Sequence, residues 1–168
     1  MRGKIFSRKE STMVKEGEKA PDFNLPGTDE TGTEKVFSLK DYRGAKVVLY
    51  FYPRDNTPGC TKEACDFRDN IQRVARAGAS VVGVSPDSIK SHKGFREKHG
   101  LAFPLLSDAD KKVAEAYGAF GEKKMYGKTT KGIIRSTFLI DEKGRIKKAW
   151  SKVKVAGHVE EVLSSLKD

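Results

Sequence analysis

The stretch VVLYFYPRDNTPGCTKEAC, residues 47–65, joins an apolar strand directly to the start of a helix. Its first six residues form a continuous run of β-branched and aromatic side chains, which is typical of a central strand buried on both faces. Thr57 then fits the N-cap of a helix, and Pro58 fits its first position. The pattern therefore places Cys60 in the first turn of a helix that follows a buried strand.

Two effects at a helix start act on the thiol of Cys60. The positive end of the helix dipole favours the thiolate, and backbone N–H groups that lack a helical partner can donate hydrogen bonds to it. An apolar stripe at helical spacing runs from Cys60 through Ala64, Phe67, Ile71 and Val74, so Cys60 begins the core-facing side of the helix. We interpret Cys60 as a nucleophile rather than as an inert core residue.

The second cysteine, Cys65, lies five residues further along the same predicted helix. At about 100° per residue it points about 140° away from Cys60, and helix geometry separates the two Cα atoms by roughly 8.6 Å. A disulfide needs Cα atoms within about 7 Å of each other. A bond between these cysteines would therefore require the start of the helix to unwind.

Cysteine usage also narrows the class of protein. Two neighbouring cysteines are too few for a secreted disulfide scaffold, which favours redox or metal chemistry in a reducing compartment, the cytoplasm. The Cys-x4-Cys spacing matches neither the usual zinc ligand sets nor the Cys-x-x-Cys of disulfide exchangers. We expect His92 and His99 on a solvated helix and His158 near a helix start, with no acid-base role, and Trp150 to serve packing.

Other parts of the chain predict alternating strands and helices. Apolar runs predict strands at 80–84, 136–140 and 146–150, and the last two form a hairpin through the turn at 142–144. Prolines and glycines at 21–32 indicate a loop-rich entry segment that pairs as short strands.

Helical spacing and stop signals predict helices over 57–77, 88–99, 109–117 and 157–166. Together with the strands, this order predicts an α/β protein whose central mixed sheet has helices on both faces. The order is compatible with a thioredoxin-like fold, although the pattern alone leaves other three-layer folds open.

The 168 residues suit one domain, which we expect to span residues 14–168. Residues 1–13 carry basic side chains without the apolar core of a secretory signal, so export is not expected. A flexible tail is favoured, while a transit peptide and a translation start at Met13 stay open. No apolar run is long enough for a membrane span.

Positive charge is concentrated in the C-terminal half of the chain. The formal net charge is +10, and residues 120–155 hold eleven Lys or Arg against three acids, which gives 11 − 3 = +8. Such a surface can bind nucleic acid or steer an acidic partner. No aromatic interleaving or nucleic-acid motif accompanies the charge, so we favour a solvated, lysine-rich face.

The spacing P-x-x-x-T-x-x-C, formed by Pro53, Thr57 and Cys60, resembles the active-site signature of peroxiredoxins. The run FYPRDNTPGCTKEACDFRD, with its second cysteine five positions on, resembles the PrxQ or bacterioferritin-comigratory-protein branch. The similarity continues through VVGVSPDSIKSHKGFREKHGLAFPLLSD and GIIRSTFLIDEKGRI to the Gly157–His158 helix start. It covers the chain from about Val14 onward and implies a thioredoxin-like fold and a thiol-dependent peroxidase.

The resemblance assigns roles to residues that match the signature. It implies that Cys60 is the peroxidatic cysteine and Cys65 the resolving cysteine. It implies that the Thr57 hydroxyl holds the peroxide oxygen and the thiolate, and that Pro53 shields the sulfur from water.

Two charged residues complete the set that the resemblance implies. Arg135, at the start of the strand at 136–140, would offer a permanently charged donor to the thiolate and to the leaving oxygen. Glu63 would orient this arginine. Glu63 could equally be a first-turn acid at an exposed helix position, favoured by the helix dipole.

The reaction that the resemblance implies has three steps. Cys60 reduces a hydroperoxide and becomes a sulfenic acid, Cys65 condenses with it, and thioredoxin or a similar dithiol reduces the disulfide. No metal, haem or flavin cofactor is implied, and we expect a monomer without membrane or nucleic-acid partners. Two alternatives stay open: a thiol-disulfide exchanger, and a non-enzymatic protein that binds nucleic acid through residues 120–155.

Overall fold

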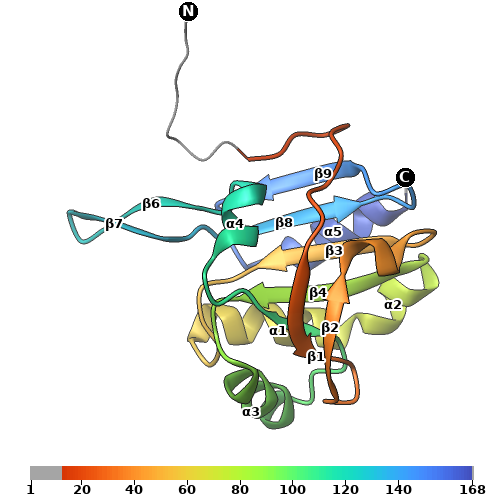
Figure 1. The fold of residues 1–168 in the computed structure, drawn as a ribbon, viewed down its shortest axis with the longest axis horizontal. Coiled ribbons are helices and arrows are strands. Elements are labelled where there is room, and N and C mark those ends of the chain that lie inside the picture. The colour runs from red at the N-terminus through yellow and green to blue at the C-terminus, as the bar shows by residue number, and fades with distance from the viewer. Residues whose placement is uncertain (1–12, 168) are drawn as a thin grey trace, which may run out of the picture.

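A seven-stranded mixed sheet forms the centre of the protein, which we describe from a computed structural model over residues 13–167 (Figure 1). Its strand order is β2-β1-β5-β4-β3-β8-β9. The bounds of these strands are β1 Asn24–Thr28, β2 Glu34–Ser38, β3 Lys46–Phe51, β4 Ala79–Ser85, β5 Leu105–Ser107, β8 Ser136–Ile140 and β9 Ile146–Ser151. A separate two-stranded hairpin, β6 Phe120–Met125 with β7 Lys128–Ile133, projects from one end of the sheet (Figure 1).

Helices cover both faces of the sheet, as the sequence predicts. They are α1 Pro58–Asp69, α2 Ile71–Arg76, α3 Ile89–His99, α4 Lys112–Tyr117 and α5 His158–Leu166, with a 3-10 turn at Leu39–Tyr42. Side chains of β3 alternate between two buried apolar clusters, because successive residues of a strand point to opposite faces. One cluster also receives side chains from α1, α2, α3 and α5, and the other from α4 and the segment before β1.

The position of β3 determines where the active-site loop lies. This strand pairs in parallel with β4 on one side and antiparallel with β8 on the other. In the antiparallel register Phe51, the last residue of β3, is opposite Ser136, the first residue of β8. Consequently Arg135 comes next to the point where β3 ends and the loop to α1 begins.

Some of the predicted helix boundaries are wrong. The helix expected over 57–77 is broken at Asn70, whose backbone leaves helical geometry and whose side-chain amide donates to the carbonyl of Asp66 at 2.8 Å. The helix expected from residue 109 begins only at Lys112. Lys111 has a positive φ of 63°, and the buried Asp108 carboxylate accepts the N–H groups of Val113 and Ala114.

Three strands were not predicted from the sequence. β5 has only three residues, which is too short for a recognisable pattern. The hairpin β6–β7 is mostly polar and lacks the apolar alternation of a half-buried strand. By contrast, the β8–β9 hairpin and the β1–β2 pair form as expected.

The described part of the chain contains no helix with the length and apolar character needed to span a membrane. Most of the predicted tail, residues 1–12, lies outside the described residues.

Candidate active site

Cys60 lies in the first turn of α1, as the sequence predicts. The helix begins at Pro58 with Thr57 at the N-cap position, and its first hydrogen bond runs from Thr61 N–H to the Thr57 carbonyl at 2.8 Å. The Cys60 side chain is only 2% exposed and joins the cluster of Ala64 and Phe67 beneath the helix. The sulfur is therefore shielded from bulk water while it stays at the positive end of the helix dipole.

Arg135 connects the sulfur to a buried carboxylate. Its Nη2 donates to Cys60 Sγ at 3.4 Å, and its Nη1 donates to Glu63 Oε1 at 2.6 Å. The absence of a side chain at Gly59 permits this approach, because a Cβ there would lie 3.2 Å from Arg135 Nη2. Two residues that are 72 positions apart in the sequence, Glu63 and Arg135, thus form a charged pair next to the thiol.

Glu63 is completely buried, so the expectation of an exposed first-turn acid is wrong. Burial raises the pKa of Glu63 to about 7, although Arg135 pulls this pKa downward. Burial lowers the pKa of Arg135, but the opposite charges of Glu63 and Cys60 outweigh it and the net shift is upward. Arg135 is therefore a permanent positive charge at the sulfur.

The Glu63 carboxyl should make stability depend on pH. Its folded pKa of about 7 exceeds its ordinary value of 4.5, so the native state binds more protons than the unfolded state between these values. The free energy of unfolding should then fall as pH rises from 5 to 8, by roughly 2–3 kcal/mol from this group alone. The glutamine of Glu63→Gln does not titrate, so we expect this pH-dependent part of the free energy of unfolding to disappear.

Urea unfolding of the wild type and of Glu63→Gln at pH 5 and pH 8 measures this difference. The variant also places an amide where the carboxyl accepted from Arg135, but the effect of this exchange on the variant's own stability does not change with pH, because neither glutamine nor arginine titrates in this range. An equal fall in stability for both proteins between pH 5 and pH 8 would exclude a raised pKa of Glu63.

Thr57 occupies the N-cap position without capping the helix with its side chain. Its hydroxyl donates to the Arg54 carbonyl at 2.9 Å instead of accepting from an N–H of the first turn. The hydroxyl oxygen keeps its acceptor lone pairs, which can receive a hydrogen bond from a ligand. The predicted N-cap position of Thr57 is thus confirmed, although its side chain makes no cap bond.

An open cavity of about 550 Å³ adjoins Arg135. Pro53, Ile134 and Val153 give it apolar walls. Lysines from β6 and from the turn after β9 add positive charge, and one acid, Glu122, is also present. A small molecule can therefore approach the arginine from this side, where it would contact both apolar side chains and positive charges.

Cys60 and Cys65 are both free cysteines within one continuous helix. Cys60 is buried and Cys65 is half-buried. Ideal helix geometry keeps their Cα atoms roughly 8.6 Å apart, beyond the reach of a disulfide. The structure therefore corresponds to the dithiol form of the protein.

His92 does not lie where the sequence analysis predicts, whereas His158 stands at the start of α5 as expected. His92 is completely buried rather than on a solvated helix surface, and it faces Asp55 and the carbonyl of Leu106. Its position three residues before the buried Phe95 is the signal that could have placed it on the inner face of α3. His158 is also buried, with Nε2 2.8 Å from the Thr137 hydroxyl.

His99 is half-buried, with its ring against Phe95, and Trp150 packs edge-on to the ring of His158. Burial lowers the pKa of His158, which Glu161 partly offsets. Within the described residues, no group of three or more histidine, cysteine or acidic side chains is arranged to hold a metal ion.

Many of the basic residues of the segment 120–155 lie on the β6–β7 hairpin. Lys124, Lys128 and Lys131 are exposed there, and Tyr126 at its tip is 96% exposed. This placement agrees with a solvated, lysine-rich surface. The absence of a nucleic-acid partner stays a prediction.

The site contains a buried cysteine at a helix start, a guanidinium that donates to its sulfur, and a carboxylate that accepts from the same guanidinium. These features define a class of thiol enzymes that act on electrophilic oxygen or sulfur. The AhpC/TSA family profile matches residues 16–149. The chain belongs to this family, and its relatives place it in the peroxiredoxin Q or Bcp branch.

Similar proteins support this placement over nearly the whole chain. Peroxiredoxin Bcp of Bacillus subtilis is 55% identical over 152 residues, which are 90% of this chain and 94% of the relative. Peroxiredoxin Bcp of Escherichia coli is 44% identical over 155 residues, which are 92% and 97% of the two chains. A solved structure of Xanthomonas campestris peroxiredoxin Q is 48% identical, has a TM-score of 0.77 and covers 85% of this chain and 89% of that one.

These similarities confirm the predicted class and fold. The protein is a thiol-dependent peroxidase with a thioredoxin-like fold. Its family implies a peroxide substrate and a thiol reductant.

Proposed function

We propose that Cys60 is the peroxidatic nucleophile and that Arg135 stabilises both its thiolate and the leaving oxygen. The observation that supports this most strongly is the bond from Arg135 Nη2 to Cys60 Sγ at 3.4 Å, made while Nη1 is held by Glu63 at 2.6 Å. The cation is thus fixed against the atom that reacts before the peroxide arrives. Such preorganised charge is worth more in a water-poor site than in solution.

The first step is an in-line displacement at oxygen. The Cys60 thiolate attacks the terminal oxygen of the hydroperoxide, an S–O bond forms and the O–O bond breaks. The products are Cys60 sulfenic acid and an alkoxide or hydroxide, which takes a proton to leave as alcohol or water. Negative charge grows on the leaving oxygen, where the guanidinium of Arg135 can donate to it.

Two loop residues complete the proposed site. The Thr57 hydroxyl donates to Arg54, so its lone pairs can accept a hydrogen bond from the O–H of the peroxide. Pro53 lines the cavity beside Arg135 and offers no N–H to compete for the substrate. It therefore restricts the access of water to the sulfur.

In the second step Cys65 resolves the sulfenic acid. The Cys65 thiolate attacks the Cys60 sulfur, a disulfide forms and the oxygen leaves as water. Since both cysteines lie in α1 beyond bonding distance, its first turns must unwind. An external dithiol, thioredoxin or a similar protein, then reduces the disulfide by two thiol-disulfide exchanges.

Cys65→Ser should separate these two steps. We expect the variant to keep the first peroxide step at the wild-type rate, because Cys65 does not contact Cys60 in the helix. It should lose nearly all dithiol-dependent turnover through the internal disulfide and accumulate Cys60 sulfenic acid, then sulfinic acid as peroxide rises. Mass spectrometry of the quenched proteins measures each species.

The wild type provides the matched control for this experiment. One equivalent of peroxide should give an intramolecular Cys60–Cys65 bond and a loss of two mass units. An oxidised wild type without that bond, or a Cys65→Ser variant that recycles normally, would exclude Cys65 as the resolving residue.

We further propose that residues 14–168 form the single functional domain and that the protein acts as a monomer in the cytoplasm. A continuous central sheet across the described chain supports the single domain. A reducing compartment suits a mechanism that depends on two free cysteines and a dithiol reductant.

A further inference from the structure

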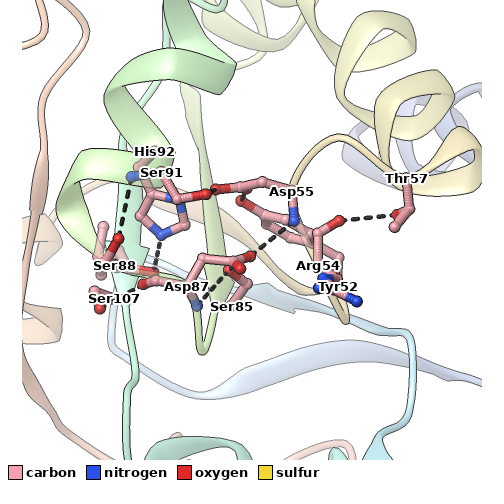
Figure 2. Close-up of polar contacts among 11 residues, drawn as sticks. Tyr52, Arg54, Asp55, Thr57, Ser85, Asp87, Ser88, Ser91, His92 and Ser107 are labelled. Carbon is pink, nitrogen blue, oxygen red and sulfur yellow. Dashed lines mark hydrogen bonds and ion pairs between the residues drawn. The ribbon is translucent and has the colours of Figure 1, made fainter.

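A buried polar network holds the loop that joins β3 to α1 (Figure 2). The Asp55 carboxylate is its centre. Its Oδ1 accepts from the Tyr52 hydroxyl at 2.6 Å, and its Oδ2 accepts from the Ser91 hydroxyl at 2.7 Å and lies 2.8 Å from His92 Nδ1. Ser91 and His92 belong to α3, so the carboxylate ties the loop to a helix other than α1.

The hydrogen-bond geometry of His92 determines how many protons the pair holds. His92 Nε2 lies 2.9 Å from the Leu106 carbonyl, which can only accept, so Nε2 carries a hydrogen. One further proton must lie between His92 Nδ1 and Asp55 Oδ2, whichever of the two atoms carries it. The pair is therefore neutral as a unit, which suits side chains that are 0% and 1% exposed.

The backbone of the same loop has a second anchor. Asp55 N–H donates to Asp87 Oδ2 at 2.7 Å, and the Ser85 hydroxyl donates to the same oxygen at 2.7 Å. The carbonyl of Asp87 in turn accepts from the Ser107 hydroxyl at 2.6 Å. Ser85 and Ser107 end β4 and β5, so this second anchor is fixed to the central sheet.

These contacts divide the active-site segment into two parts (Figure 2). The loop up to Thr57 is held by β4, β5 and α3, and the Thr57 hydroxyl bonds back to Arg54 within the loop. The helix that follows is connected to this loop by the bond from Thr61 N–H to the Thr57 carbonyl. None of the side-chain contacts of Asp55 described above involves α1, so they can persist when α1 opens.

We propose that Asp55 and His92 form a positioning pair that keeps the loop 53–57 in place while the first turns of α1 unwind and re-form. The inference rests on the proposed roles of Cys60 and Cys65. It assigns the hinge to Pro58–Gly59, between the anchored loop and the cysteine. The loop carries Pro53 and Thr57, so its fixed position preserves the peroxide site for the next turnover.

The first test compares two substitutions of Asp55 in the full-length reduced protein. Asp55→Ala removes the anchor, and we expect the rate constant of the peroxide step to fall about 100-fold, the loss typical of a displacement near 1 Å in an active site. Asp55→Asn can still accept from Tyr52 and donate its amide to neutral His92 Nδ1. We therefore expect Asp55→Asn to retain the wild-type rate constant.

Rapid-quench alkylation and mass spectrometry measure the rate of Cys60 oxidation. Tyr117→Phe is the matched control, because it removes a partly buried 2.6 Å hydrogen bond from a tyrosine of the other apolar cluster to the Pro21 carbonyl and should leave the rate unchanged. Equal loss in Asp55→Ala and Asp55→Asn would overturn the proposal, since it would show that the charge of Asp55 matters and not its hydrogen bonds. A wild-type rate in Asp55→Ala would also overturn it.

If Asp55→Ala does not fold, the variant His92→Leu decides the matter. It removes the ring that contacts Asp55 Oδ2 and leaves the Tyr52 and Ser91 hydroxyls on the carboxylate, so a folded protein with a slower peroxide step supports the pair, and an unchanged rate overturns it. Cys60→Ser keeps the two hypotheses apart. If that variant is inactive while the Asp55 variants are normal, only the positioning pair is wrong.

Hydrogen exchange tests the hinge directly. In the disulfide form, the amide of Asp55 should keep its protection, because its acceptor is Asp87, whereas the amide of Thr61 should lose protection because its acceptor lies across the hinge. The dithiol form is the reference for both amides. Loss of protection at both positions in the disulfide form would show that the loop moves with the helix and would overturn the proposal.

Discussion

Replacing Cys60 by serine should reduce dithiol-dependent peroxide consumption to the rate of the uncatalysed reaction. A serine hydroxyl is not ionised near neutral pH and is a far weaker nucleophile than a thiolate, so it cannot replace the thiolate as the attacking group. The change is nearly isosteric, and the new hydroxyl can accept from Arg135 Nη2, which now donates to the sulfur. We therefore expect the folded structure to persist.

Peroxide consumption with an excess of dithiol measures the effect, and thermal unfolding checks the fold. Cys65→Ser is the matched control, because it also removes one thiol from α1 but should still consume one equivalent of peroxide per chain. Substantial turnover by Cys60→Ser would contradict its assignment as the nucleophile.

Local sequence signals were sufficient to predict the strand-to-helix segment that contains Cys60. The apolar run of β3 is long and unbroken, and Thr57, Pro58 and the stripe below Cys60 all indicate the same helix start. β5 and the β6–β7 hairpin give no comparable signal, because a segment of three residues or a lysine-rich hairpin can equally be a loop. Their structure depends on contacts with distant parts of the chain.

The charged contacts of the site depend on tertiary structure in the same way. Glu63 looked exposed because its neighbours Lys62 and Asp66 are polar, yet the register of β8 against β3 brings Arg135 over the helix and buries the acid. His92 was missed because a histidine in a helix rich in charged residues resembles a surface residue. Its partner Asp55 comes from a loop 37 residues earlier, which no local pattern connects to it.

Replacing Arg135 by methionine should slow the peroxide step by about 10²–10³-fold, the usual effect of removing one charged or hydrogen-bonding donor from a preorganised site. Methionine keeps much of the side-chain volume but cannot donate to the sulfur or to the leaving oxygen. The loss should therefore appear in the reaction of reduced Cys60 with peroxide and not in the later reduction of the disulfide. Rapid mixing of reduced protein with peroxide, quenched by alkylation, measures this rate constant.

The fold of Arg135→Met should survive because Glu63 can become neutral. A buried carboxylate that loses its cation would be costly, of the order of 3–5 kcal/mol, if it stayed ionised. Burial already raises the pKa of Glu63 to about 7, and loss of Arg135, which lowers this pKa, should raise it further, so the carboxyl binds a proton instead. Kinetics at pH 6 thus separate lost catalysis from lost stability.

Arg73→Met, which removes an exposed ion pair with Glu160, is the matched control and should react at the wild-type rate. A folded Arg135→Met protein with an unchanged rate constant would exclude Arg135 from the peroxide step.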